Sequence, residues 1–348
     1  MRIAIIGTGF AGLAMGIQLK QHGFEDFVIF EREATVGGTW RDNHYPGAAC
    51  DVQSHLYSLS FAPNPRWSRQ FAPQAEILEY TRGLVETYGL GPHIRCSEGV
   101  EYATYVSERG MWEVDTAQDR YTFDLVVSAC GGLSRPRIPE FRGLSEFRGD
   151  VFHTAQWNHD VDLRGKNVAI IGTGASAIQV IPAIAPLVGQ LDVYMRTPSW
   201  ILPREDSAVP STTQKLFEKF PKLLEAKRAA IYSRMESRAL AFFNPALMKL
   251  AQKQLDEFLD ASVADPELRE KLRPTYLPGC KRILLSDDFI RDATRNVHLI
   301  TEGVREFYSG GIRDGMGGER QHDVVVMATG FQVSEDVAPF PIVGDSAP

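Results

Sequence analysis

Two glycine-rich turns, far apart in the chain, constrain its fold more than any other feature of the sequence. The first is Gly7-Thr-Gly9-Phe-Ala-Gly12, which follows the apolar run Arg2–Ile6. The second is Gly172-Thr-Gly174-Ala-Ser-Ala177, which follows a similar run, Asn167–Ile171. A β-branched run that ends in such a turn and leads into a helix is typical of a dinucleotide-binding βαβ unit. The sequence therefore predicts an α/β fold with two such units.

In the first unit we expect a helix at Ala11–His22 and a second strand at Phe27–Glu31. Gly7 permits a tight turn, Gly9 lets the backbone approach a pyrophosphate, and Gly12 lets the helix pack closely on the strand. The phosphates would lie at the helix N-terminus, where free N–H groups favour negative charge. Glu31 lies close to the expected position, roughly 20 residues into the unit, for binding ribose hydroxyls. The alternative is that Glu31 is a solvated charge at a strand end.

The second unit predicts a helix at Ala175–Ala185 and a strand at Leu191–Arg196. Ala177 replaces the third glycine and still permits close packing. The strand ends in Arg196-Thr197 instead of an acidic residue. Because a carboxylate would repel a 2′-phosphate, whereas an arginine can bind one with two charge-assisted hydrogen bonds, this site favours NADPH over NADH. Arg196 could instead be an ordinary surface charge.

Residues Ser211–Lys271 differ from the rest because they are rich in Leu, Ala, Lys, Glu and Gln, with apolar residues spaced near 3.6. This pattern predicts two or three helices, broken at Asn244-Pro245 and near Asp265-Pro266. We expect a helical insertion at about residues 208–275. A membrane-surface helix is the less favoured alternative, since the charges are mixed and not predominantly basic.

Four further runs predict strands, and they complete the expected domain plan. They are Trp112–Thr116, Phe123–Ala129, Val297–Ile300 and Asp323–Ala328. The last leads into Ala328-Thr-Gly-Phe331, which we expect to return the chain to the first domain. Residues 1–145 and 322–348 would then form the first domain, and residues 146–321 the second.

Charge and cysteine content exclude several classes of function. The net charge of −7 gives no overall attraction to nucleic acid or to an anionic membrane. The four cysteines, Cys50, Cys96, Cys130 and Cys280, include no C-x-x-C pair, so we expect neither a zinc site nor a redox dithiol. No apolar stretch approaches the ~18 residues of a spanning helix, and the N-terminus lacks signal-peptide features. These observations predict a cytoplasmic protein without a bound metal.

Five more motifs, together with the turns, carry a family resemblance. They are Gly37-Gly38-Thr39-Trp40, Tyr45-Pro-Gly-Ala-Ala-Cys50-Asp51, Phe147–Trp157, Gly279-Cys-Lys-Arg282 and Ala328–Phe331. The Phe147–Trp157 segment fits the pattern F-x-G-x-x-x-H-x-x-x-W. Over nearly its whole length the chain resembles the type I Baeyer–Villiger monooxygenases. The resemblance implies two Rossmann-like dinucleotide-binding domains, one for FAD and one for NADP, with the helical insertion in the second.

The resemblance also implies roles for residues outside the turns. Arg282 would lie beside the flavin, where its guanidinium stabilises a C4a-peroxide anion and the adduct with a ketone. Asp51 would hold Arg282 in place, and Lys281 would contact the 2′-phosphate. Without the resemblance, Lys281-Arg282 would be interpreted as a basic pair on a loop. His153 would control domain movement, although a single histidine is more often a hydrogen-bonded structural residue.

The predicted site therefore combines three catalytic residues with a larger set that contacts the cofactors. The catalytic residues are Arg282, Asp51 and His153. The cofactor-binding residues are Gly7, Gly9, Phe10, Ala11, Gly12, Glu31, Gly38, Thr39, Trp40, Asp51, Val52, Tyr57, Val100, Gly172, Thr173, Gly174, Ala175, Ser176, Ala177, Gln179, Arg196, Thr197, Lys281 and Arg282.

The function implied is an FAD- and NADPH-dependent conversion of a ketone and O2 to an ester or lactone by way of a C4a-peroxyflavin, in a monomer or weak homo-oligomer. One alternative is a flavin-containing monooxygenase that oxidises nitrogen or sulfur; another is a nucleotide-binding fragment without turnover. Two departures from the family pattern are Asn158 after the tryptophan and an end at Pro348. We expect the family's C-terminal segment to be absent from this chain.

Overall fold

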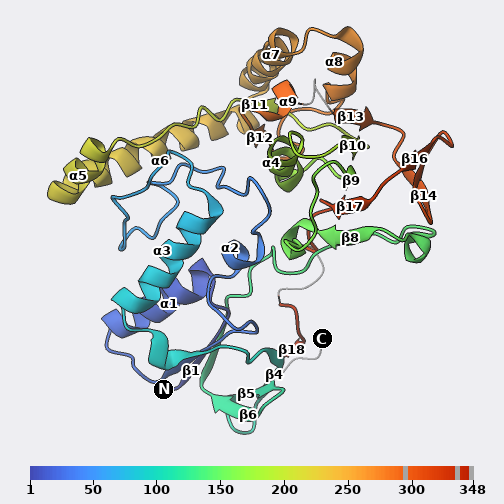
Figure 1. Ribbon diagram of the computed structural model, residues 1–348. Helices are drawn as coiled ribbons and strands as arrows, with labels where there is room; N and C mark the ends of the chain where they lie inside the picture. The colour runs from blue at the N-terminus through green and yellow to red at the C-terminus, as the bar shows by residue number, and fades with distance from the viewer. Residues whose placement is uncertain (293–296, 334–337, 345–348) are drawn as a thin grey trace.

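The computed structural model describes residues 1–292, 297–333 and 338–344. The chain forms two α/β domains with a helical insertion, which confirms the predicted fold class (Figure 1). In Figure 1 the first domain occupies the lower half, in blue and cyan, and the second lies at the upper right, in green and red. The yellow helices of the insertion extend to the left, above the first domain.

The first domain is built on a four-stranded parallel sheet. Its strand order is β3-β2-β1-β7, with bounds Ile94–Arg95, Phe27–Phe30, Ile3–Ile6 and Leu125–Ser128. Helix α1, Phe10–Gln21, connects β1 to β2 and buries Leu13 and Ile17 against Ile3, Ile5 and Ile29. Helix α3, Gln74–Thr87, packs beside α1. The predicted first βαβ unit is therefore present, with its glycine turn at the carboxyl end of β1.

A second sheet completes this domain. It consists of strands β18, β4, β5 and β6, with bounds Ile342–Val343, Val100–Val106, Met111–Thr116 and Arg120–Phe123. The strand predicted at Trp112–Thr116 is present in this sheet as β5. Ala103, Val114 and Phe123 are fully buried and share a hydrophobic cluster with Phe30 of β2. The two sheets thus enclose one core.

The second domain has a five-stranded parallel sheet of order β13-β10-β9-β17-β8. The bounds of these strands are Val297–Ile300, Gln190–Tyr194, Asn167–Ile171, Val324–Met327 and Asp150–His153. Helix α4, Ala175–Ile184, follows β9 and buries Ile178, Ile181 and Ile184. The short helix α9, Phe289–Asp292, lies against α4. The predicted second βαβ unit is therefore also present.

The position of β17 corrects the predicted domain boundary at residue 322. Val324–Met327 pairs with both β9 and β8, so this strand is an inner strand of the second sheet. The apolar run Val324–Met327 predicts a fully buried strand, but its residue pattern does not indicate which of the two parallel sheets the strand joins. The chain returns to the first domain after β17, where Phe331 pairs with Pro136 and β18 pairs with β4. Residues 334–337 and 345–348 of the predicted C-terminal part lie outside the described residues.

Two small sheets in the second domain were not predicted from the sequence. Strands β14, β15 and β16, with bounds Val304–Tyr308, Gly311–Asp314 and Glu319–Gln321, form an antiparallel sheet. Its Phe307 packs on Phe147, with ring centroids 6.0 Å apart. Strands β11, Ile201–Leu202, and β12, Leu284–Leu285, pair at the two ends of the insertion. The chain therefore leaves the second domain for the insertion and returns to it at the same place.

The insertion contains four helices where two or three were expected. They are α5, Ser211–Lys219; α6, Pro221–Phe243; α7, Pro245–Ser262; and α8, Pro266–Leu272. Both predicted breaks are confirmed, because the side chains of Asn244 and Asp265 accept backbone hydrogen bonds at the N-termini of α7 and α8. The additional break lies at Phe220-Pro221. Among the described helices, none combines the length and apolar character needed to cross a bilayer.

Candidate cofactor and catalytic site

The glycines of the first turn divide into two kinds. Gly7 has φ +111°, and a Cβ there would lie 2.7 Å from the Ala129 carbonyl oxygen. A Cβ on Gly12 would lie 1.9 Å from the carbonyl oxygen of Gly7. Gly9 differs, because the nearest atom to its Cβ would be Gly38 Cα at 3.9 Å. The protein itself therefore requires glycine at positions 7 and 12, whereas the space beside Gly9 is open.

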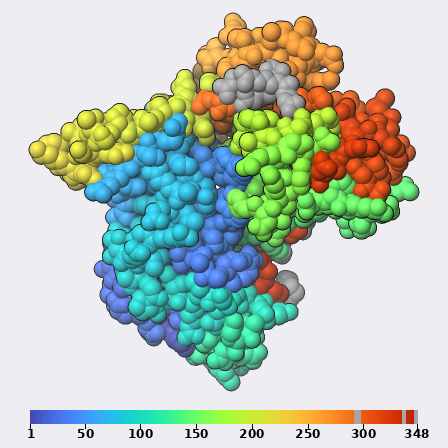
Figure 2. Space-filling view, in the orientation of Figure 1, coloured from blue at the N-terminus to red at the C-terminus, as the bar shows by residue number. Residues whose placement is uncertain are grey.

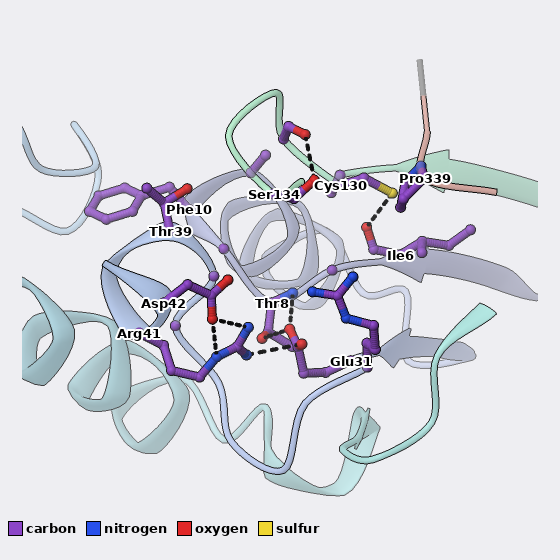
Figure 3. A pocket seen from close by; sticks show the side chains of 18 of the residues that line it. Ile6, Thr8, Phe10, Glu31, Thr39, Arg41, Asp42, Cys130, Ser134 and Pro339 are labelled. Carbon is purple, nitrogen blue, oxygen red and sulfur yellow. Dashed lines mark hydrogen bonds and ion pairs between the residues drawn. The ribbon is translucent and has the colours of Figure 1, made fainter. Parts of the chain in front are cut away.

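That open space belongs to a cavity of about 270 Å³ at the carboxyl ends of β1 and β2 (Figure 3). Ten of the predicted cofactor-binding residues line it: Gly7, Gly9, Phe10, Ala11, Glu31, Gly38, Thr39, Trp40, Tyr57 and Val100. The sequence did not reveal several other lining residues, among them Thr8, Arg32, Arg41, Asp42, Cys130, Ser134, Pro339 and Phe340. Gly12, Asp51, Val52 and Arg282 were predicted to bind the flavin cofactor, but they do not line this cavity.

Glu31 is a buried and well-paired carboxylate in this cavity. It accepts hydrogen bonds from the backbone nitrogens of Thr8, at 3.1 Å, and Glu33, at 2.9 Å, and from the Thr8 hydroxyl. Arg41 Nη1 lies 3.0 Å from its Oε1, as Figure 3 shows. These contacts exclude the interpretation of Glu31 as a solvated charge. Arg41 also pairs with Asp42, at 2.7 Å, although burial raises the pKa of Asp42.

An aromatic wall closes one side of the cavity. Trp40, on the one-turn helix α2 (Thr39–Asp42), donates its Nε1–H to the Tyr57 hydroxyl at 3.0 Å. Phe10 packs on Tyr57 with ring centroids 5.2 Å apart. Burial raises the pKa of Tyr57, and the bond from Trp40 opposes this only in part. Tyr57 is therefore a neutral phenol that presents a rigid apolar face to the cavity.

The predicted partners Asp51 and Arg282 form an ion pair. Arg282 Nη2 lies 2.8 Å from Asp51 Oδ2, and their side chains are 66% and 27% exposed. Cys50 and Val52, the chain neighbours of Asp51, pack in one hydrophobic cluster with Phe10, Trp40 and Tyr57, so the pair lies near the aromatic wall. The neighbouring Cys50 is buried, which raises the pKa of its thiol to about 12 and leaves it unreactive. The proximity of the guanidinium to the flavin stays a prediction.

The segment that carries Asp51 also makes the contact between the domains. Gln179 of α4 accepts a hydrogen bond from the Tyr45 hydroxyl at 3.0 Å and donates one to the Ala49 carbonyl at 3.0 Å. Gly47 has φ +82°, and a Cβ there would lie 2.4 Å from the Gln179 carbonyl oxygen. Gln179, predicted to bind a cofactor, therefore holds the Asp51 segment against the second domain.

The second glycine turn repeats the geometry of the first. A Cβ on Gly172, which has φ +123°, would lie 2.3 Å from the Ala328 carbonyl oxygen, and Ala177 is fully buried. A Cβ on Gly174, the N-cap of α4, would meet nothing within 4 Å in the described structure. Gly174 thus leaves the helix N-terminus accessible to a phosphate, as Gly9 does in the first turn.

Of the residues predicted for the 2′-phosphate, Thr197 has a direct contact with this turn. Arg196 and Thr197 follow β10, and the Thr197 carbonyl accepts a hydrogen bond from the Thr173 hydroxyl at 3.0 Å. Arg196 is exposed, as a phosphate-binding arginine must be. Lys281 is also exposed, with its ammonium 4.9 Å from the centre of the Tyr276 ring. Phosphate binding by these residues stays a prediction.

His153 is the last residue of β8 and is fully buried. Its Nδ1 accepts a hydrogen bond from the Ala155 backbone nitrogen at 3.1 Å, and burial lowers its pKa. Its ring packs edge-on against Phe331, with centroids 5.7 Å apart. Because Phe331 lies on the segment that returns to the first domain, His153 packs at a crossing between the domains and not in the cofactor cavity.

Comparisons with known proteins agree with this geometry. The sequence matches the flavin-binding monooxygenase-like family over residues 1–346. A Baeyer–Villiger monooxygenase of Pseudomonas aeruginosa is 48% identical over 97% of this chain and 64% of its own length. A second, from Streptomyces coelicolor, is 42% identical over 96% of this chain and 65% of its own length. The chain thus spans about two thirds of the length of these curated relatives.

Solved structures show the same similarity. Cyclohexanone monooxygenase from Rhodococcus sp. Phi1, bound to NADP+, matches with a TM-score of 0.83 and 29% identity, covering 95% of this chain and 70% of that one. Oxidised steroid monooxygenase bound to NADP matches with a TM-score of 0.87 and 30% identity, covering 100% and 75%. The resemblance to Baeyer–Villiger monooxygenases is therefore confirmed, and the chain belongs to the flavin-binding monooxygenase-like family.

Proposed function

We propose that this chain binds FAD in the cavity of the first domain and NADPH at the second glycine turn, and that it carries out a Baeyer–Villiger oxidation. One oxygen atom of O2 is inserted next to the carbonyl of a ketone to give an ester or lactone, and the other is reduced to water with the two electrons of NADPH, which leaves as NADP+. The observation that carries the proposal is the Asp51–Arg282 ion pair, which lies near the aromatic wall of the cavity and next to a contact between the domains.

The residues present fit both cofactors. The space beside Gly9 and Gly174 lets a pyrophosphate approach each helix N-terminus without steric conflict. Glu31 is fixed at the end of β2, where its oxygens can accept hydrogen bonds from ribose hydroxyls. Trp40, Tyr57 and Phe10 line the cavity with aromatic side chains that a ring system can pack against. The bound flavin supplies the oxygen activation, which amino-acid side chains cannot provide.

The protein supplies position, charge and exclusion of water. Arg282 keeps its positive charge at every working pH, so it can stabilise negative charge that develops on the reacting oxygens. Asp51 orients that guanidinium and is itself held by the domain contact through Gln179. The half-buried aromatic wall limits the access of water to one side of the cavity.

Arg196 provides a test of the choice of NADPH over NADH. We expect Arg196→Ala to weaken NADPH binding by roughly tenfold to a hundredfold, the effect of losing one charge-assisted contact. NADH binding is expected to change little, because NADH lacks the 2′-phosphate. Fluorescence titration of both nucleotides measures this, with Arg164→Ala as the control, since Arg164 is an exposed arginine of the same domain. Equal losses for both nucleotides would contradict 2′-phosphate binding.

The experiment that tests the function is a ketone panel. Protein reconstituted with FAD is given NADPH, O2 and cyclic or aryl ketones, and the products are identified by mass. We expect products heavier than the ketone by one oxygen atom. A flavin-containing monooxygenase that oxidises heteroatoms would instead convert amines and thioethers but no ketones; sulfoxidation alone does not separate the two. A sample that stays colourless after addition of FAD would support a nucleotide-binding protein without turnover.

A further inference from the structure

The yellow helices of the insertion lie against the first domain in Figure 2. Arg228 of helix α6 contacts one turn of that domain's chain. Arg228 Nη1 lies 2.8 Å from the carbonyl oxygen of Leu56, 3.0 Å from that of Ser58 and 3.3 Å from that of His55. It also lies 3.3 Å from the Ser58 hydroxyl oxygen. One guanidinium nitrogen therefore meets four oxygen acceptors that converge on a single point.

These carbonyls converge because residues 53–58 form a single helical turn. The backbone nitrogens of Leu56 and Tyr57 both donate to the Gln53 carbonyl at 2.9 Å. The Leu56 carbonyl also accepts a hydrogen bond from the Ser58 backbone nitrogen at 2.9 Å. The carbonyls at the end of such a turn have no i+4 helical partner and carry partial negative charge, so a cation there is favourable. The start of the turn is held as well, because Arg234 donates to the Gln53 side-chain oxygen at 2.7 Å. Helix α6 thus fixes both ends of the turn.

This turn connects the two parts of the site. Asp51, which pairs with Arg282, lies just before it, and Tyr57, which lines the cofactor cavity, lies within it. Any displacement of the turn would move the phenol of Tyr57 and the carboxylate of Asp51 together. We propose that Arg228 is a positioning residue that holds this turn, and through it Tyr57 and Arg282, in the geometry needed for oxygen transfer to the ketone. The proposal rests on the proposed function.

The geometry of these contacts predicts which residues can replace Arg228. Every contact of Arg228 with the turn is made by one nitrogen, and the planar fork of the guanidinium is not used as a bidentate clamp. A lysine ammonium carries three N–H donors and a full charge at one point. Lysine can therefore replace arginine here, although it cannot at a bidentate site. Methionine has a long apolar side chain but neither charge nor donor.

The test compares Arg228→Met, Arg228→Lys and the control Arg238→Met in FAD-reconstituted protein. Arg238 is an exposed arginine of the same helix. The readouts are the rate of flavin reduction by NADPH and the fraction of consumed NADPH that yields ester. We expect Arg228→Met to reduce flavin at a near-normal rate, with ester yield lowered at least about tenfold, the effect of losing a charge-assisted bond. Arg228→Lys is expected within about threefold of the parent, and Arg238→Met unchanged.

Several results would overturn the proposal. Normal ester yield in Arg228→Met would do so, as would equal losses in the lysine and methionine variants, which would indicate packing alone. If the methionine variant does not fold, Arg228→Gln takes its place, because glutamine keeps a donor without a charge. If the parent protein forms no ester from any ketone, the proposed function fails. The role of Arg228 in holding the turn is then tested by the fluorescence of bound FAD. We expect this fluorescence to differ from that of the parent protein in Arg228→Met and to match it in Arg228→Lys.

Discussion

Replacing Arg282 with alanine is expected to abolish ester formation while NADPH still reduces the bound flavin. Reduction depends on the two nucleotide sites, whereas oxygen transfer depends on a fixed positive charge near the reacting oxygens. Removal of one such stabilising group lowers the rate by about 10²- to 10³-fold. Anaerobic stopped-flow absorbance measures flavin reduction, and product mass after aerobic turnover measures ester formation. The predicted result is a normal rate of flavin reduction and no detectable ester.

Arg196→Ala is the control for this prediction, because it is expected to impair NADPH binding and not oxygen transfer. It is expected to require more NADPH but to form ester normally once NADPH saturates, which is the opposite pattern. Asp51→Asn is expected to fall between the parent protein and Arg282→Ala, because the guanidinium stays but the acceptor at 2.8 Å loses its negative charge. Normal ester formation by Arg282→Ala would contradict the role assigned to this residue and remove the main support for the proposed function.

Gly12→Ala is expected to destabilise the first domain strongly. The added Cβ would lie 1.9 Å from the Gly7 carbonyl oxygen, which is a backbone atom fixed by β1 and α1. Relief would require α1 to move away from the sheet that buries Leu13 and Ile17. Overpacking typically destabilises by about 1–3 kcal/mol, and a backbone clash belongs at the upper end or beyond. Urea denaturation of the protein without FAD measures the change in the free energy of unfolding.

Gly9→Ala is the matched control for that substitution. Its Cβ would meet only Gly38 Cα, at 3.9 Å, so the free energy of unfolding without FAD is expected to change little. FAD binding is expected to be lost, because the methyl group would occupy the path of the pyrophosphate. Similar unfolding free energies for Gly12→Ala and the parent protein would show that the close approach of α1 to β1 is not required.

The local units of the fold were predictable because their signals are local. Asn167–Ile171 has the predicted bounds, since a β-branched run that meets a glycine turn leaves little choice of register. The sheet that receives Val324–Met327 was not predictable, because membership depends on pairing with strands more than a hundred residues earlier. The break at Phe220-Pro221 did have a signal, since proline ends or begins a helix, but it was overlooked.

The site was predictable to a similar extent. Glycines and aromatic residues of the motifs line the cavity because the motif and the cavity share the same turns. Arg41 was missed because, in sequence, it is one charged residue among several after Trp40. Pro339 and Phe340 were missed because their segment reaches the cavity only after the chain has crossed the second domain. The contacts of Arg228 depend on the placement of the insertion, which helical periodicity does not specify.

The inner position of β17 has a consequence for how the molecule can be divided. The polypeptide enters the second sheet at β8, leaves it only after β17, and then supplies Pro339, Phe340 and β18 to the first domain. No single cut separates two self-sufficient halves. A fragment that ends near residue 145 would lack part of the wall of its own nucleotide cavity. The first domain is therefore complete only when the chain has passed through the second sheet.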